Sequence, residues 1–185
     1  MRVIAGEKKG LLLSTPKGLH TRPTNDRIKE TLFNIISFDL PDASFLDLFS
    51  GSGQMGIEAL SRGASKAVFI DNDKAACKCI NDNLIKTGYK DRSDLHDQDV
   101  ISFLKTYSGK GFDIIFIDPP YHENLEDKII EALSESNAVT DHTVIILEAD
   151  KNTIFSDKLP GNIYITREKV YKTNKHIFMG KGIKS

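Results

Sequence analysis

Residues 45–56 read FLDLFSGSGQMG, a short apolar run that contains one acid and continues into a glycine-rich turn. A continuous apolar run is typical of a parallel strand that is buried on both faces. Glycines directly after such a strand let the chain turn sharply into a helix, whose first backbone amides then point at a bound ligand. The stretch therefore predicts a strand, a turn and a helix that together bind a nucleotide.

Two cofactors fit this turn on spacing alone. Gly51, Gly53 and Gly56 match the dinucleotide fingerprint, and Asp71 lies at about the right distance for a ribose diol. Asp47, however, precedes the turn, and a carboxylate repels a pyrophosphate but attracts an ammonium and a sulfonium. We therefore favour S-adenosylmethionine, with S-adenosyl-L-homocysteine as the product, over a nicotinamide dinucleotide and over a turn without a ligand.

The chain after residue 41 alternates between apolar strands and amphipathic helices. We expect strands at residues 44–49, 66–70, 94–97, 112–117 and 143–148, and helices at 53–62, 73–87, 100–107 and 125–133. Such βαβ units form a parallel sheet. Residues 163–171 and 176–179 are joined by residues 172–175 without a helix and predict an antiparallel hairpin. This ending favours the α/β class I methyltransferase fold, a mainly parallel seven-stranded sheet, over the all-parallel dinucleotide fold.

The amino-terminal part has a different pattern. Residues 2–5 and 11–14 predict a small basic β-hairpin, so we divide the chain into an extension, residues 1–20, and a main domain, residues 21–185. A helix follows, with apolar residues at helical spacing and Thr24 as its expected cap. The charges around this cap fit a lid over the cofactor, a phosphate clamp or surface ion pairs. They belong to Arg22, Asp26, Arg27 and Glu30.

Acidic residues stand at or just beyond the expected carboxyl ends of three strands. Ligands of open parallel sheets bind at this edge. We expect Asp47 to face the methionine end of the cofactor, Asp71 with Asn72 to bind the ribose, and Asp99 to lie near the adenine amine. Helix capping is the alternative for Asp71 and Asp99. The turn itself would supply Phe49, Ser50, Gly51 and Gly53 to the cofactor site.

The fourth expected strand runs into Asp118, Pro119, Pro120 and Tyr121. Two prolines remove two backbone donors and fix the chain direction, which leaves carbonyl groups free to accept hydrogen bonds. Asp118 and the Pro119 carbonyl can hold the hydrogens of an exocyclic base amine, and Tyr121 can stack on a base that has left its helix. The sequence therefore predicts a base-amine methyltransferase, although a proline-rich turn remains the alternative.

Charge is unevenly distributed along a chain whose net charge is only -1. Residues 1–30 carry +4 and residues 164–185 carry +5, so the residues between them carry -10. Basic ends around an acidic middle fit a polyanion held over a cofactor domain. We expect RNA contacts from Lys8, Lys9, Arg22, Thr24, Arg27, Lys172 and Lys175.

Other features of the sequence set limits on function. No apolar run approaches the length of a membrane span and no secretory leader is visible, so we expect a cytoplasmic protein. The two cysteines, Cys77 and Cys79, and the scattered histidines lack the spacing of metal ligands, and we expect no metal.

The whole chain resembles the RsmD-type family of bacterial 16S ribosomal RNA guanine-N2 methyltransferases. The resemblance rests on residues 2–6 (RVIAG), on the cluster between residues 22 and 34, on residues 46–63 (LDLFSGSGQMGIEALSRG), on DPPY at 118–121 and on the basic terminal hairpin. Lys29 stands where this family usually has arginine. The resemblance implies methyl transfer to N2 of one guanine in 16S RNA, on the small ribosomal subunit or its assembly intermediate.

Three rival functions stay open at this point. An adenine-N6 methyltransferase of DNA or RNA could use the same DPPY residues. An NAD-dependent oxidoreductase would use the glycine-rich turn, and a non-catalytic RNA-binding protein would use the basic ends alone.

Overall fold

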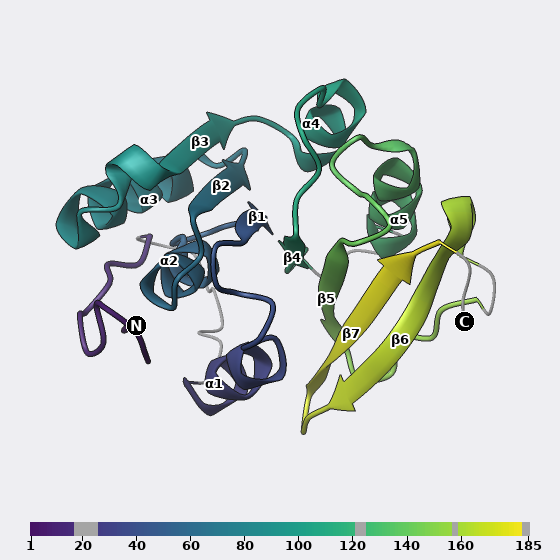
Figure 1. Ribbon diagram of the computed structural model, residues 1–185, viewed down its shortest axis with the longest axis horizontal. Helices are drawn as coiled ribbons and strands as arrows, with labels where there is room; N and C mark the ends of the chain where they lie inside the picture. The colour runs from purple at the N-terminus through teal and green to yellow at the C-terminus, as the bar shows by residue number, and fades with distance from the viewer. Residues whose placement is uncertain (17–25, 121–124, 157–158, 183–185) are drawn as a thin grey trace.

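The computed structural model describes residues 1–16, 26–120, 125–156 and 159–182. Its centre is one seven-stranded sheet with the strand order β3-β2-β1-β4-β5-β7-β6 (Figure 1). The strands are β1 (Ser44–Leu48), β2 (Lys66–Asp71), β3 (Ser93–Asp97), β4 (Ile114–Ile117), β5 (Val144–Asp150), β6 (Ile163–Val170) and β7 (Asn174–Lys181).

Among the described residues, five α-helices cover the two faces of this sheet (Figure 1). One face packs against α1 (Asp26–Ile35), α2 (Gln54–Ser61) and α3 (Lys74–Thr87), and the other against α4 (Val100–Thr106) and α5 (Leu125–Glu135). Short 3-10 turns lie at Lys90–Arg92 and Pro160–Asn162. The two hydrophobic layers arise because successive strand residues point to opposite faces.

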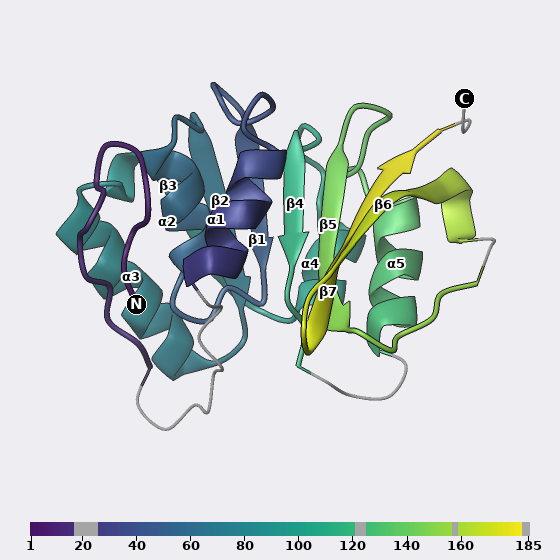
Figure 2. The same ribbon diagram turned by 90° about the horizontal axis from the view of Figure 1, so that it is seen from below.

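The order of the strands reverses between β1 and β4. Strands β1 to β5 pair in parallel, whereas β7 pairs antiparallel with both β5 and β6. Figure 2 shows the long β6–β7 hairpin beside β5. The antiparallel end confirms the predicted class I methyltransferase fold, and the reversal places the expected ligand site at the carboxyl ends of β1 and β4.

The terminal hairpin has a shorter turn than the sequence predicts. β7 begins at Asn174, so only residues 171–173 remain for the turn. The reason is that β5 extends to Asp150, and Asp150 and Ala149 pair with Asn174 and Lys175. The sequence predicts Asn174 and Lys175 in the turn, but pairing with β5 holds both residues in the strand.

The amino-terminal segment pairs with itself less regularly than the sequence predicts. Arg2 and Leu12 form a single antiparallel bridge, and the amide of Val3 donates to the Leu11 carbonyl at 3.0 Å. The segment lies along α2 and α3 (Figures 1 and 2), and Val3 and Leu13 are buried in the same hydrophobic layer as these helices. The division of the chain at residue 20 stays a prediction, since the extension shares its core with the main domain.

Candidate active site

The turn between β1 and α2 is held in a tight and partly strained conformation. Phe49, Gly51 and Gly53 have positive φ angles of 62°, 57° and 75°. Left-handed backbone is normal for glycine but rare for a bulky residue such as Phe49. The Ser50 hydroxyl fixes the turn, because it donates to the Asp47 carbonyl at 2.6 Å and accepts from the Ile70 amide at 3.0 Å.

Two glycines of this turn serve different purposes. A Cβ atom on Gly51 would meet no atom of the described residues within 4 Å, so a ligand can approach the backbone there. A Cβ atom on Gly56 would lie 2.4 Å from the Phe69 ring, so only glycine lets α2 pack this closely on β2. The geometry therefore combines an open surface at the turn with a rigid attachment of the helix behind it.

Asp47 is buried in β1 under this turn. Its Oδ2 accepts a hydrogen bond from the Gly56 amide at 2.9 Å, so the side chain of Asp47 holds the first turn of α2. Burial raises the pKa of Asp47 to about 8, and the charge of Asp71 adds to this rise, whereas the Gly56 hydrogen bond opposes it. Burying a carboxylate without a counter-charge is costly, so a cation bound beside Asp47 would stabilise its ionised form.

Asp71 holds the same turn from β2. Its Oδ2 accepts from the Gly51 amide at 2.8 Å, and its Oδ1 accepts from the Asp73 amide at 2.9 Å. The cap of α3 is Asp73, whose side chain accepts from the amides of Ala75 and Ala76. Asp71 is therefore not the helix cap, and it stays available at the edge where a ribose is expected. The neighbouring Asn72 is exposed.

Asp99, in contrast, is the N-cap of α4. Its Oδ1 accepts from the Ser102 amide at 2.8 Å, as the capping alternative predicts. The side chain is exposed beyond the end of β3. Its contact with an adenine amine stays a prediction.

Asp118 directly follows β4, next to β1 at the reversal of strand order. Its amide donates to the Leu48 carbonyl at 3.4 Å, which ties the two strand ends together. Burial, and then the charges of Glu148 and Asp47, raise the pKa of Asp118 well above its usual value. Pro119 is buried and Pro120 is exposed, and Tyr121 lies outside the described residues. The structure thus brings Asp47 and Asp118 close enough for their charges to interact.

Sequence reasoning missed a polar cluster beside Asp118, formed by Glu148, Asn174 and His176. Glu148 Oε1 accepts from Asn174 Nδ2 at 2.5 Å, and Glu148 Oε2 lies 3.2 Å from His176 Nε2. All three side chains are buried. An acid at the carboxyl end of an expected strand was a usable signal for Glu148, since the same rule selected Asp47 and Asp71.

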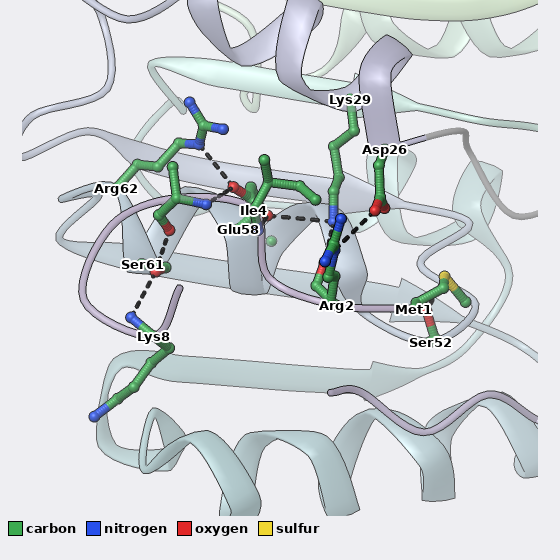
Figure 3. Close-up of polar contacts among 12 residues, drawn as sticks. Met1, Arg2, Ile4, Lys8, Asp26, Lys29, Ser52, Glu58, Ser61 and Arg62 are labelled. Carbon is green, nitrogen blue, oxygen red and sulfur yellow. Dashed lines mark hydrogen bonds and ion pairs between the residues drawn. The ribbon is translucent and has the colours of Figure 1, made fainter. Parts of the chain in front are cut away.

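A second buried network joins the amino-terminal segment to α2 (Figure 3). Glu58 accepts from the Ile4 amide at 2.8 Å, the Ala5 amide at 3.0 Å and Arg62 Nε at 2.8 Å. Lys29 from α1 lies 3.2 Å from Glu58 and donates to the Arg2 carbonyl at 2.7 Å. Burial lowers the pKa of Lys29, although the charge of Glu58 acts in the opposite direction. The network fixes the basic segment against α2, the helix that follows the glycine-rich turn.

The expected RNA contacts occupy different environments. Lys9, Arg27 and Lys172 are exposed, and Lys8 is half-buried and lies 2.8 Å from Glu7. Lys175 is buried, and its ammonium donates to both carboxylate oxygens of Glu168 at 3.0 and 3.1 Å. Arg22 and Thr24 lie outside the described residues. We therefore do not include Lys175 in the proposed RNA surface.

Two observations concern membranes and metals. In the part of the chain that the structure describes, no helix is long and apolar enough to cross a membrane. Over the same residues, the histidines, cysteines and acids form no group of three or more that could hold a metal ion.

The family model described as Conserved hypothetical protein 95 matches residues 1–180. The chain belongs to this family. The ribosomal RNA small subunit methyltransferase D of Haemophilus influenzae is 37% identical over 155 residues, which span 82% of this chain and 80% of that protein. The enzyme of the same name from Escherichia coli K12 is 35% identical over 172 residues, or 92% of this chain and 84% of that protein.

A solved structure agrees with these relatives. The Escherichia coli protein yhhF has 34% sequence identity and a TM-score of 0.86, and the match covers 98% of this chain and 97% of that chain. Together with the named relatives, this confirms that the chain is a member of the RsmD-type methyltransferase family, as the sequence motifs predict.

Proposed function

We propose that the protein transfers a methyl group from S-adenosylmethionine to the exocyclic N2 amine of a guanine in 16S ribosomal RNA. The observation that carries this proposal is the position of Asp118 and Pro119, which lie at the carboxyl end of β4 beside the glycine-rich turn. Membership of the RsmD-type family and the names of the relatives support the RNA substrate.

The residues around the turn fit this cofactor. The backbone at Gly51 is open to a ligand, and the buried Asp47 suits the cationic methionine end. Asp71 would bind the ribose hydroxyls, with Asn72 next to it. The rest of the proposed site consists of Phe49, Ser50, Gly53 and, toward the adenine, Asp99. When bound, the cofactor supplies an electrophilic methyl group on a sulfonium.

The proposed chemistry depends mainly on position. The lone pair of a base amine is delocalised into the ring, so the amine is a poor nucleophile. Asp118 and the Pro119 carbonyl would accept the amine hydrogens and turn its lone pair toward the methyl group. A carboxylate with a raised pKa is also a stronger proton acceptor, which suits Asp118 for the proton that N2 loses on methylation. Pro120 would fix the direction of the chain, and Tyr121 would stack on the base.

The substrate would be RNA in the small subunit or in an assembly intermediate, in the cytoplasm. The proposed contacts are Lys8, Lys9, Arg22, Thr24, Arg27 and Lys172. Figure 3 shows that the segment with Lys8 is fixed on α2, because the Ser61 hydroxyl accepts from the Lys8 amide at 3.0 Å. A basic surface in a fixed position can orient a phosphate backbone without reading its sequence.

Methyl transfer from labelled cofactor to 30S particles, free 16S RNA and DNA tests this function. After digestion to nucleosides, we expect label in N2-methylguanosine from the RNA substrates. Label in N6-methyladenine alone would refute the proposal in favour of an adenine methyltransferase. Calorimetry adds a cofactor test, in which tight NAD binding without binding of S-adenosylhomocysteine would refute methyl transfer altogether.

A further inference from the structure

The Glu148–Asn174–His176 cluster lies beside Asp118, whose carboxyl group and that of Glu148 are close enough for their charges to interact. Ile117 of β4 pairs with Leu147 of β5 in parallel register, so the next residues lie side by side, Asp118 just past the end of β4 and Glu148 within β5. Because strand residues alternate in direction, both side chains lie on the face of the sheet that packs against α1 to α3. His176 lies on the same face, with its ring 6.3 Å from the Phe116 ring.

The partners of Glu148 fix its carboxylate in place. Asn174 and His176 come from β7 and contact different oxygens of Glu148. The far side of the His176 ring faces the Tyr171 hydroxyl, with 3.4 Å between Nδ1 and that oxygen. A carboxylate has about four acceptor positions, so two contacts leave Glu148 with capacity for a further donor.

Asn174 adds an acceptor that has no partner in the described part of the chain. Its side chain is 6% exposed, and no described residue donates to its Oδ1. The amide cannot be reversed, since Nδ2 is needed to donate to a carboxylate, which only accepts. An unpaired buried acceptor is costly, and such groups point to a role outside the folding of the chain. The region beside Asp118 therefore presents acceptors in excess of its own donors.

We propose that Glu148, held by Asn174 and His176, selects guanine by accepting the N1 hydrogen of the base whose N2 amine is bound by Asp118. This inference rests on the proposed function and extends it to the choice of base. Guanine presents two adjacent donors on its Watson–Crick edge, N1–H and the N2 amine. Adenine and 2,6-diaminopurine present an N1 lone pair instead, which repels an acceptor. Glu148 is thus a specificity residue, and Asn174 and His176 are positioning residues.

A base analogue in the wild-type protein gives the first test. 2,6-Diaminopurine keeps the reacting N2 amine but has no N1 hydrogen. We compare kcat/KM for 30S particles reconstituted with 16S RNA that carries either guanine or 2,6-diaminopurine at the methylated position. We expect the analogue to react roughly 10- to 100-fold less well, the usual discrimination by one specific base contact. Equal rates for the two bases would overturn the inference.

A variant gives the second test. Glu148→Gln keeps the shape of the side chain and adds a donor that can face an N1 lone pair. We expect kcat/KM for guanine to fall and the ratio between guanine and the analogue to move toward one, while calorimetry with S-adenosylhomocysteine stays unchanged. Asn174→Ala should move the ratio in the same direction. The matched control is Glu135→Gln, an exposed acid on α5, which should leave the ratio unaltered.

The outcomes separate this inference from the proposed function. If Glu148→Gln lowered kcat/KM equally for guanine and for 2,6-diaminopurine, Glu148 would have a merely structural role. This result would overturn the inference and leave the proposed methyl transfer to guanine standing. If the wild-type protein methylates adenine at this position and not guanine, the proposed function itself fails. If Glu148→Gln does not fold, the wild-type comparison of the two bases still decides.

Discussion

Glu58→Gln should destabilise the protein strongly, because Glu58 is the common acceptor of the buried network in Figure 3. In the variant, an amide nitrogen would replace one carboxylate oxygen and face groups that themselves donate, such as the Ala5 amide. Lys29 would also lose its buried counter-charge. Removing one partner of a buried ion pair costs about 3–5 kcal/mol. For a chain of this size, each kcal/mol lowers the Tm by roughly 2–4 °C, so we expect a decrease of about 6–20 °C.

The assay is thermal unfolding followed by circular dichroism at pH 7. The matched control is Asp94→Asn, which breaks the exposed ion pair between Lys66 and Asp94, whose side chains are about half exposed. Exposed pairs contribute at most about 1 kcal/mol, so the control should lose no more than a few degrees. If Glu58→Gln lost no more than the control, the assigned role of the network would be wrong.

The same variant has a pH signature. Burial lowers the pKa of Lys29, and Glu58 acts against this effect, so the variant lowers the pKa of Lys29 further. Between the folded pKa and the ordinary value of 10.5, the unfolded chain binds more protons than the folded chain, and stability rises with pH. This range is wider in Glu58→Gln. We therefore expect its deficit against wild type to be smaller at pH 9 than at pH 6, and a deficit that grew with pH would contradict the assignment.

Three further predictions concern the site itself. Gly56→Ala should lose about 1–3 kcal/mol of stability and weaken S-adenosylhomocysteine binding in calorimetry, since its Cβ would meet the Phe69 ring; an unchanged Tm would show that α2 can move away. Because burial raises the pKa of Asp47 from 3.8 to about 8, the folded ligand-free chain holds a proton that the unfolded chain releases. Its stability should therefore fall from pH 4 to pH 8, and urea unfolding should show a flatter profile for Asp47→Asn; identical profiles would exclude Asp47 as the titrating group. Asp118→Ala should abolish methyl transfer with calorimetric binding of S-adenosylhomocysteine largely kept, and a variant that still turned over would remove Asp118 from the chemistry.

The sequence was sufficient for the parts of the fold that follow from local periodicity. Apolar runs separated by helices predict the parallel strands, and glycines after the first run predict the turn after β1. Two runs without a helix between them predict the antiparallel ending. The start of β7 could not be predicted in this way, because Asn174 and Lys175 lie in the sheet through their pairing with the extended end of β5. Long-range pairing of this kind is not visible in a local window.

The site was predictable to a similar degree. Strand ends select Asp47, Asp71 and Asp118 as candidate site residues, but the local sequence does not tell which acids cap helices. The structure makes Asp73 and Asp99 the caps of α3 and α4. It also brings side chains of β5 and β7 together around Glu148, a juxtaposition that depends on strand order and not on sequence distance.

Phe49 connects the shape of the turn with the choice of stabilising mutations. A bulky residue in left-handed backbone costs on the order of 1–3 kcal/mol, and its ring packs against the layer below α4 and α5. A screen for thermostable variants should select glycine at position 49, since glycine adopts left-handed backbone without strain. The ring would then no longer brace the turn, so heat resistance gained at residue 49 should come with looser cofactor binding.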